Sequence, residues 1–295
     1  NAVLNSCITR KDKKYIISAG EHTSIHNTAK VYQEKGFNVK FIPLKNNGSI
    51  DLNALESELD NSVALVSCIH VSNETGAIND IKRVVELTRS YSPNAMIHSD
   101  GVQAVGKIDI DLKDLGVDYY TISAHKIHGP KGIGALYIKN VNKFKPFIIG
   151  GGQESNLRAG TENTPAIMSF KVAVESLDKE NFSSFKQAFI SNLSGDYYLI
   201  SDENCVDNII SVCFAGVRGE TIAHMVESKG YLIGTGSACN SGTKINRVIA
   251  SIVPKKYAEG ALRISFDADV TVKDCEDLAQ TISNAVSEYR KTLNR

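Results

Sequence analysis

Short runs of strand-forming residues alternate with helical patterns through the first half of the chain, and this alternation restricts the possible folds more than any other feature. The runs are rich in Val, Ile and Tyr, and they cover residues 14–20, 38–44, 62–71, 94–100, 118–124 and 133–139. Helical patterns such as residues 24–36 and 81–91 lie between them. Such alternation is typical of α/β proteins, in which helices cover both faces of a mostly parallel sheet.

The pattern changes in the second half of the chain. A helical pattern at residues 164–180 leads out of the predicted sheet, and a strand at 208–215, a helix at 221–229 and a strand at 231–237 follow it. The last helix is predicted to begin near Thr271, because Asp274 three residues later forms an acidic variant of the capping box. We therefore expect a large domain over residues 1–170, and a linker helix with a smaller α+β domain over residues 171–295.

Charge and cysteine content exclude several classes of protein. The chain has 33 basic and 33 acidic residues, so it carries no basic surface excess for nucleic acid or anionic membranes. No apolar run is long enough to span a membrane. The six cysteines include no CxxC pair, so we expect no metal site, no disulfide framework and a cytoplasmic setting.

Two polar residues follow neighbouring strand runs, and their chemistry is complementary. Lys126 lies in "SAHKIHGPKG" at the end of one run, and Asp100 ends the run "NAMIHSD". A partly desolvated lysine is a nucleophilic amine that attacks carbonyls, including the aldehyde of pyridoxal 5'-phosphate (PLP). PLP enzymes also need a carboxylate beside the pyridine nitrogen, because a protonated ring accepts electrons better. The alternative for Lys126 is a solvated side chain beside a turn.

Six motifs in order along the chain resemble segments of the cysteine desulfurases, which are PLP enzymes of the class V aminotransferase group and fold type I. They are "AGEHTSIHNT", "VSNETGAI", "HSDGVQAVGKIDID", "SAHKIHGPKG", "GGGQESNLRAGTENTPA" and "GTGSACNSG". The resemblance implies a PLP-binding large domain over residues 1–170. It also implies removal of sulfur from L-cysteine to give L-alanine, with transfer to an acceptor such as an iron–sulfur scaffold or a tRNA-thiolation protein.

The resemblance also implies a role for each cofactor-binding residue. Lys126 would hold PLP covalently and later move the substrate proton, and Asp100 would pair with the ring nitrogen. His22 would stack on the ring as a catalytic residue, although a surface histidine at a helix start is the alternative. The other ring and phosphate contacts would come from Gln103, Ser123, His125 and Asn73, and from Thr161, which would reach the cofactor of a partner in a homodimer.

Substrate and sulfur would be handled by residues from the two halves of the chain. The resemblance assigns the substrate carboxylate to Asn73 and Arg263, and a guanidinium suits that task because it pairs with a carboxylate through two hydrogen bonds. An edge-strand arginine is the alternative for Arg263. Cys239 lies in the small-residue loop "GTGSACNSG", which favours exposure, and it would accept the sulfur as a persulfide. Cys68 and Cys213 lie within strand runs and are expected in the core.

The start of the sequence departs from the family pattern. The chain begins at Asn1 rather than Met, so we expect a processed chain or a piece of a longer product. The resemblance implies a preceding segment with a Gly-rich helix start that binds the PLP phosphate. Two alternatives to an active desulfurase therefore stay open. One is an inactive remnant that serves as an interaction subunit, and the other is a further class V PLP enzyme such as a selenocysteine lyase.

Overall fold

The computed structural model describes residues 1–295 except 178–180, 236–245, 268 and 294–295. Contacts within the chain divide it into two compact units. The first unit comprises Asn1–Pro43, Ile50–Val71 and Asn79–Lys179, and the second comprises Leu44–Ser49, Ser72–Ile78 and Glu180–Arg295. Two short segments from the first half therefore group with the C-terminal part. The domain boundary expected at residue 170 stays a prediction.

The first unit is built on a six-stranded sheet in the order β2-β1-β3-β4-β5-β6. Every pairing is parallel except that of β5 with β6, which is antiparallel. The strands are β1 (Lys14–Ser18), β2 (Asn38–Ile42), β3 (Val63–Ile69), β4 (Met96–Asp100), β5 (Tyr119–Ser123) and β6 (Gly134–Ile138). The mostly parallel α/β sheet predicted from the sequence is confirmed.

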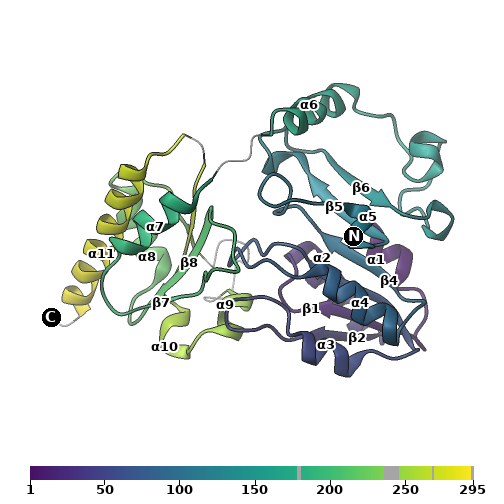
Figure 1. Cartoon of the computed structure of the whole chain (residues 1–295), viewed down its shortest axis with the longest axis horizontal. Helices are drawn as coiled ribbons and strands as arrows, with labels where there is room; N and C mark the ends of the chain where they lie inside the picture. Colours follow the sequence, from purple (N-terminus) through teal and green to yellow (C-terminus); the bar gives the residue numbers. More distant parts are fainter. Residues whose placement is uncertain (178–180, 236–245, 268, 294–295) are drawn as a thin grey trace. The chain divides into compact units, whose positions relative to one another are not determined.

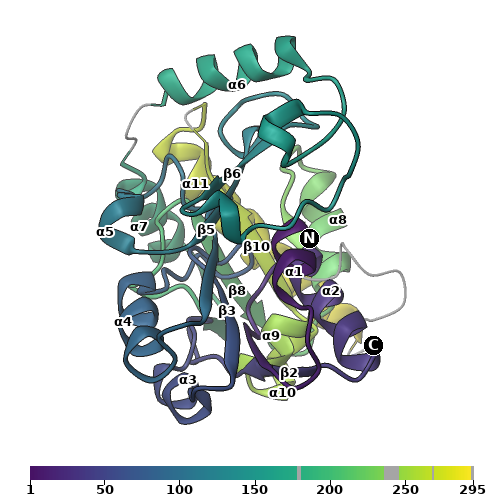
Figure 2. The same cartoon turned by 90° about the vertical axis from the view of Figure 1, so that its right-hand side faces the viewer.

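Helices cover both faces of this sheet, and alternate residues of each strand face opposite sides. Ile16 of β1 packs with residues of α3 and α4, while its neighbours Tyr15 and Ile17 pack with residues of α1 and α2. Figure 2 shows the sheet between these two helix layers. The helices of this unit are α1 (Ala2–Cys7), α2 (Thr23–Glu34), α3 (Leu52–Glu58), α4 (Ile81–Tyr91), α5 (Leu112–Leu115) and α6 (Thr164–Glu175), with single 3₁₀ turns η1 (Ala124–Lys126), η2 (Val141–Lys143) and η3 (Gln153–Asn156).

The second unit has its own sheet and core. Its strands pair antiparallel in the order β7-β8-β10-β9, and Figure 1 labels β7 and β8. They are β7 (Tyr197–Leu199), β8 (Ile209–Phe214), β9 (Gly234–Thr235) and β10 (Ala261–Ser265), and the helices are α7 (Ser183–Ser191), α8 (Gly219–Glu227), α9 (Arg247–Ile252), α10 (Lys255–Ala258) and α11 (Val272–Leu293). The strand expected at 231–237 is thus limited to two described residues.

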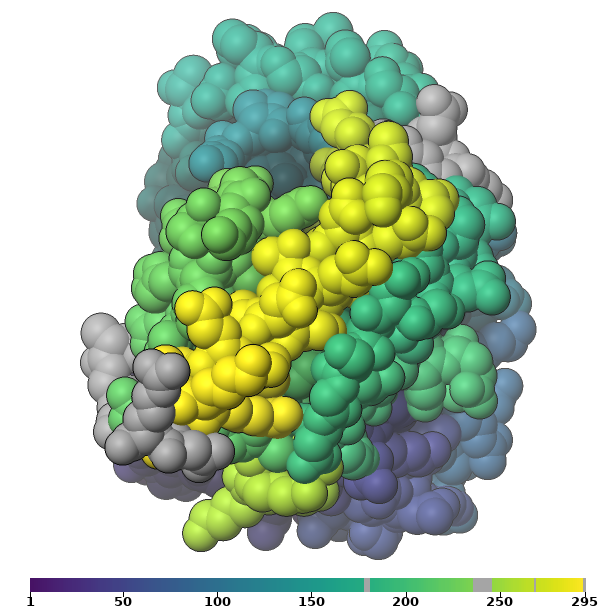
Figure 3. All heavy atoms as spheres, turned by 90° about the vertical axis from the view of Figure 1, so that its left-hand side faces the viewer, coloured from purple at the N-terminus to yellow at the C-terminus, as the bar shows by residue number. Residues whose placement is uncertain are grey.

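The final helix closes the core of the second unit. Figure 3 shows α11, in yellow, lying beside α7 across one face of this unit. The predicted capping box is confirmed, because the Thr271 amide donates to Asp274 over 2.8 Å and the Asp274 amide donates to Thr271 Oγ1 over 3.2 Å. Cys213 is buried in this unit and Cys68 in the first, as expected. No described helix is both long enough and apolar enough to cross a membrane.

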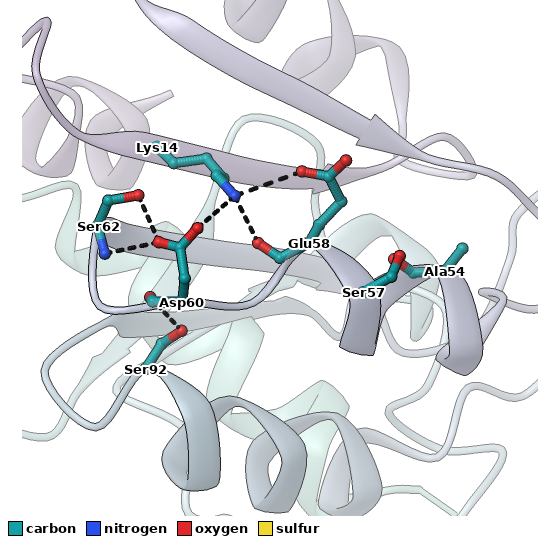
Figure 4. A network of polar contacts seen from close by, with 7 residues as sticks. All are labelled: Lys14, Ala54, Ser57, Glu58, Asp60, Ser62 and Ser92. Atoms are coloured by element: carbon teal, nitrogen blue, oxygen red, sulfur yellow. Dashed lines mark hydrogen bonds and ion pairs between the residues drawn. The ribbon is translucent and has the colours of Figure 1, made fainter.

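A polar cluster at the amino ends of β1 and β3 also contacts the ends of α3 and α4, as Figure 4 shows. The Lys14 ammonium, at the start of β1, donates to the Glu58 carbonyl over 2.8 Å and to the Asp60 carboxylate over 2.7 Å. Asp60 also accepts the Ser62 amide over 2.7 Å, and Ser92 Oγ donates to the Asp60 carbonyl over 2.7 Å. These bonds lower the pKa of Asp60 to about 2, first through Lys14 and then through Ser62.

The depressed pKa of Asp60 predicts a pH-dependent contribution to stability. A carboxyl whose folded pKa lies below its unfolded value stabilises the fold above about pH 3.9, and this contribution is lost as the pH falls towards 2. The Asp60 side chain is half exposed, so Asp60→Asn should lower the free energy of unfolding at pH 7 by no more than about 1 kcal/mol. Urea unfolding at pH 7 and pH 3 measures this difference, which should shrink at pH 3. The control Asp12→Asn, in a fully exposed pair with Arg10, should have no measurable effect, and equal effects of the two variants would contradict the assignment.

Candidate active site

Three of the predicted site residues follow the carboxyl ends of parallel strands in one sheet. Asp100 is the last residue of β4, and it is in register with Thr121 of the adjacent β5. Lys126 ends the 3₁₀ turn η1, which follows β5 directly. His22 precedes α2, four residues after β1. Ligands of α/β sheets bind at this edge, because the strand-to-helix loops converge there.

Asp100 is a buried carboxylate, with 6% of its surface exposed. Burial is the main influence on this group and raises its pKa, while the hydrogen bond from the Val102 amide opposes that effect. The amide lies 3.0 Å from Asp100 Oδ1, and Thr121 of β5 is in register with Asp100. A buried carboxylate is stabilised by a cationic partner. A protonated pyridine nitrogen is such a partner, so Asp100 fits the cofactor that the sequence predicts.

Gly101 allows an aromatic ring to lie against the backbone beside Asp100. A Cβ atom at this position would come within 2.0 Å of the Tyr120 ring. That ring is buried, and its hydroxyl lies 2.8 Å from His70 Nδ1. Burial lowers the pKa of His70 to about 4, so the imidazole is neutral near pH 7. The close approach therefore requires glycine directly after the site carboxylate.

Gln103 is buried in the turn after β4, and its amide is oriented by Lys107. The Lys107 ammonium donates to Gln103 Oε1, which identifies that atom as the oxygen. The NH₂ group of Gln103 is consequently the donor side of the amide. A donor at this position suits the ring hydroxyl of PLP, as the sequence predicts.

The segment after β5 places several polar groups together. Ser123 Oγ lies 2.7 Å from His125 Nδ1, and His125 and Lys126 are both solvent-exposed. The pKa of His125 is lowered, mainly by partial burial and then by the charges of Lys126 and Lys131. Because Lys126 is solvent-exposed, the described residues of the first unit do not shield its amine from water.

His22 and Thr161 are exposed, and the contacts predicted for them stay predictions. His22 caps α2, where its Nδ1 accepts the Ser24 amide over 3.3 Å. Thr161 lies on the exposed loop between η3 and α6. Cys239 lies outside the described residues.

Asn73 and Arg263 meet within the second unit. Arg263 is on β10, and its Nη1 donates to the Asn73 carbonyl over 3.0 Å. The same nitrogen lies 3.8 Å from Glu74 Oε2, and Asn73 Nδ2 donates to Glu74 Oε1 over 2.8 Å. The Arg263 guanidinium is thus held against the "SNET" turn with a carboxylate beside it. The sequence analysis did not identify Glu74 as a partner of Arg263, although this glutamate is visible in "SNETG".

Comparison with known proteins identifies the family. The model of the family "Aminotransferase class-V" matches residues 1–278. "Cysteine desulfurase IscS 1" of Archaeoglobus fulgidus is 33% identical over 292 residues, which cover 95% of this chain and 76% of that protein. "Cysteine desulfurase IscS" of Clostridium botulinum (strain Hall) is 33% identical over 96% of this chain and 74% of that protein. The chain belongs to the class-V aminotransferases, among their cysteine desulfurases.

Solved structures of cysteine desulfurase relatives share the fold. A structure described as "NIFS-LIKE PROTEIN" has a TM-score of 0.85 at 31% identity, covering 97% of this chain and 78% of that chain. A NifS-like protein from Rickettsia africae has a TM-score of 0.82 at 29% identity, covering 97% and 78%. The predicted PLP fold type I is therefore confirmed, and this family of enzymes is PLP-dependent.

The chemistry of the described residues suits PLP. Asp100 supplies a buried carboxyl group, Lys126 an amine and Gln103 an oriented amide donor. Within the part of the chain that the structure describes, no group of three or more His, Cys, Asp or Glu residues is arranged to hold a metal ion. Sequence reasoning missed Lys107, although its position four residues after Gln103 was visible.

Substitution of Gly101 tests the close packing beside Asp100. Gly101→Ala should lower the free energy of unfolding by about 1–3 kcal/mol, because the new methyl group overlaps the buried Tyr120 ring and the neighbours must move. Thermal or urea unfolding measures the change. The matched control is Gly152→Ala, since Gly152 has φ −80° and an added Cβ would lie 3.5 Å from its nearest neighbour. If the two variants had similar free energies of unfolding, the Tyr120 ring would be able to move aside at no cost in stability, and the close packing would not require glycine.

Proposed function

We propose that this cysteine desulfurase removes sulfur from L-cysteine with PLP, giving L-alanine and a persulfide on Cys239. The observation that carries the proposal is the buried Asp100 carboxylate on β4, adjacent to the strand that leads into Lys126. That pair fits a PLP ring, and the family assignment supplies the reaction class. The persulfide would pass to an acceptor in the cytoplasm, such as an iron–sulfur scaffold or a tRNA-thiolation protein.

PLP, when bound, supplies an electron sink for the substrate's α-carbon. In this proposal Asp100 keeps the ring nitrogen protonated, Gln103 donates to the ring hydroxyl, and His22 stacks on the ring. Lys126 Nζ holds the cofactor and then carries the proton removed from the α-carbon. Ser123, His125 and Asn73 complete the contacts with the cofactor.

Sulfur transfer itself would depend on Cys239. Its thiolate forms an S–S bond with the substrate sulfur while the substrate's C–S bond breaks. The electron pair of that bond passes to the substrate, whose carbon is then protonated to give alanine. Before this step the Arg263 guanidinium, with Asn73, would hold the substrate carboxylate. The nearby Glu74 carboxylate supports this role, because it shows that the guanidinium pairs with an anion.

We further propose that the active form is a homodimer in which Thr161 contacts the partner's cofactor. The exposed apolar side chains of α6, a helix labelled in Figure 2, support this proposal. Four large apolar side chains of this helix are exposed, and so are three in the loop before it: Ile167, Met168, Val172, Val174, Phe147, Ile148 and Ile149. An exposed cluster of this kind is typical of a protein–protein interface.

The cofactor assignment predicts a single labelled lysine. After incubation with PLP and reduction with borohydride, the adduct should map to Lys126 by mass spectrometry. Lys126→Ala should abolish the adduct, whereas Lys131→Ala, five residues away in the same exposed segment, should retain it. A label on another lysine would refute the assignment. A chain that binds no PLP would favour an interaction subunit instead.

The sulfur-acceptor assignment predicts a selective loss. Cys239→Ser should abolish sulfide release from L-cysteine while the PLP absorbance is kept, because the cofactor does not depend on this thiol. Cys68→Ser and Cys213→Ser should act through stability, since each places a hydroxyl in a core. Sulfide release and persulfide mapping measure the difference. Full turnover in Cys239→Ser would indicate another class V enzyme, and comparison with selenocysteine as substrate would identify a selenocysteine lyase.

A further inference from the structure

The turn that carries Asn73 and Glu74 is built firmly into the second unit. Ser72 Oγ accepts the amides of Glu74 and Thr75, each over 3.2 Å. The Ser72 amide donates to the Ala77 carbonyl over 2.9 Å, and Ser72, Thr75 and Ala77 are fully buried. The backbone of this turn is therefore fixed by its own hydrogen bonds, and it presents the side chains of Asn73 and Glu74 from a rigid support.

Glu74 joins the two residues that are predicted to bind the substrate carboxylate. Its Oε1 accepts Asn73 Nδ2 over 2.8 Å, and its Oε2 lies 3.8 Å from Arg263 Nη1. The same Nη1 donates to the Asn73 carbonyl over 3.0 Å. The Glu74 side chain is 19% exposed and the Arg263 side chain is 34% exposed, so water screens this ion pair only in part. Each oxygen of the Glu74 carboxylate thus contacts a different member of the predicted substrate site.

These contacts determine which donors face a substrate. A carboxylate only accepts hydrogen bonds, so the Asn73 amide atom that faces Glu74 is the nitrogen, whose second N–H can donate to a ligand. Within the part of the chain that the structure describes, both polar contacts of the Arg263 guanidinium use Nη1. Its other edge lies beside Gly234 of β9, where a Cβ atom would come within 3.2 Å of Nη2 and 3.3 Å of Nε. Glycine leaves room along the guanidinium edge that can pair with a carboxylate through two hydrogen bonds.

Glu74 has two opposing effects on an anion that approaches Arg263. An arginine side chain loses much rotamer freedom when a ligand immobilises it. A guanidinium that Glu74 and the Asn73 carbonyl already hold has lost this freedom before the substrate arrives, so binding is more favourable. The Glu74 charge also repels a second carboxylate, but the guanidinium lies between the two anions and the pair is partly exposed to solvent, which weakens the repulsion. Positioning is therefore the larger effect.

We propose that Glu74 is a positioning residue that holds the Asn73 amide and the Arg263 guanidinium in the orientation that receives the substrate carboxylate. Glu74 acts through these two side chains and does not contact the substrate. The inference rests on the proposed function and deepens it, because it explains how the carboxylate of L-cysteine is recognised.

Steady-state kinetics of two Glu74 variants test the proposal. Glu74→Ala removes both contacts and should raise the KM for L-cysteine about three- to tenfold while kcat is retained, since the loss is comparable to that of one hydrogen bond in substrate binding. Glu74→Gln keeps an oxygen that accepts Asn73 Nδ2, so its KM should rise less. The matched control is Glu276→Gln, which removes an ion pair of 3.6 Å with Lys273 in the same unit and should keep the wild-type KM.

A change of background shows whether Glu74 acts through its two partners. In the double variant Asn73→Ala/Arg263→Lys, the further change Glu74→Ala should leave kcat/KM unaltered, because the side chains that Glu74 orients are no longer there. A general structural role would instead lower kcat/KM by the same factor in both backgrounds.

Side-chain NMR tests the positioning without any cofactor. In ¹⁵N-labelled protein free of PLP, relaxation of Arg263 Nε and Asn73 Nδ2 should show restricted motion in the wild type and in Glu276→Gln, and increased motion in Glu74→Ala. Glu74→Gln should restrict Asn73 as the wild type does and should release Arg263. If Glu74→Ala does not fold, the release of Arg263 in Glu74→Gln still tests the ion pair.

The outcomes separate this inference from the proposed function. An unchanged or lowered KM in Glu74→Ala, an equal effect in the double-variant background, or unaltered motion of Arg263 in both Glu74 variants would overturn the positioning role. Failure of the wild type to bind PLP or to release sulfide would overturn the proposed function. The relaxation measurement still decides the role of Glu74 in that case, because it uses the cofactor-free protein.

Discussion

Parallel pairing of β1, β3, β4 and β5 is the constraint on which the first unit depends. Parallel strands align their carboxyl ends, so residues far apart in the sequence follow strand ends at one edge. The register then decides which side chains share a face: Asp100 lies beside Thr121, and Ser67 lies beside His98. A slip of one residue would reverse the face of every side chain in a strand and would remove Asp100 from its hydrogen-bond donors.

Burial gives the polar residues of this sheet their chemical character. Asp100 and His98 both have pKa values displaced towards their neutral forms, chiefly because burial disfavours charge. Hydrogen bonds satisfy these buried groups, since the Val102 amide donates to Asp100 over 3.0 Å and Ser67 Oγ lies 2.9 Å from His98 Nδ1. At the opposite ends of the strands, Asp60 is half exposed and paired with Lys14, and its pKa is lowered instead. The same residue type is thus a buried carboxyl group with a raised pKa at one edge and an ion-pair partner with a lowered pKa at the other.

The two compact units divide the predicted site residues between them. The first contains Lys126, Asp100 and Gln103, and the second contains Asn73 and Arg263. Asn73 belongs to the second unit because the segment Ser72–Ile78 contacts the C-terminal part of the chain: Val206 donates to the Gly76 carbonyl over 2.9 Å, and Ser201 donates to the Thr75 carbonyl over 2.6 Å. This segment lies between β3 and β4 of the first unit's sheet, and nothing in the linear sequence indicates that it packs with the second unit.

The sequence by itself determined the α/β class, the strands that carry Asp100 and precede Lys126, and the capping box at Thr271, because these depend on local periodicity and on residue type. The motifs also determined the family. Only the tertiary structure decided that Gly101 is required by the Tyr120 ring, that Lys107 orients Gln103, and that Glu74 pairs with Arg263. It also decided that Ser67 lies between Glu21 and His98 in a buried group of hydrogen-bonded side chains. Contacts of this kind depend on strand register and on side-chain direction between distant segments, and a linear pattern contains neither.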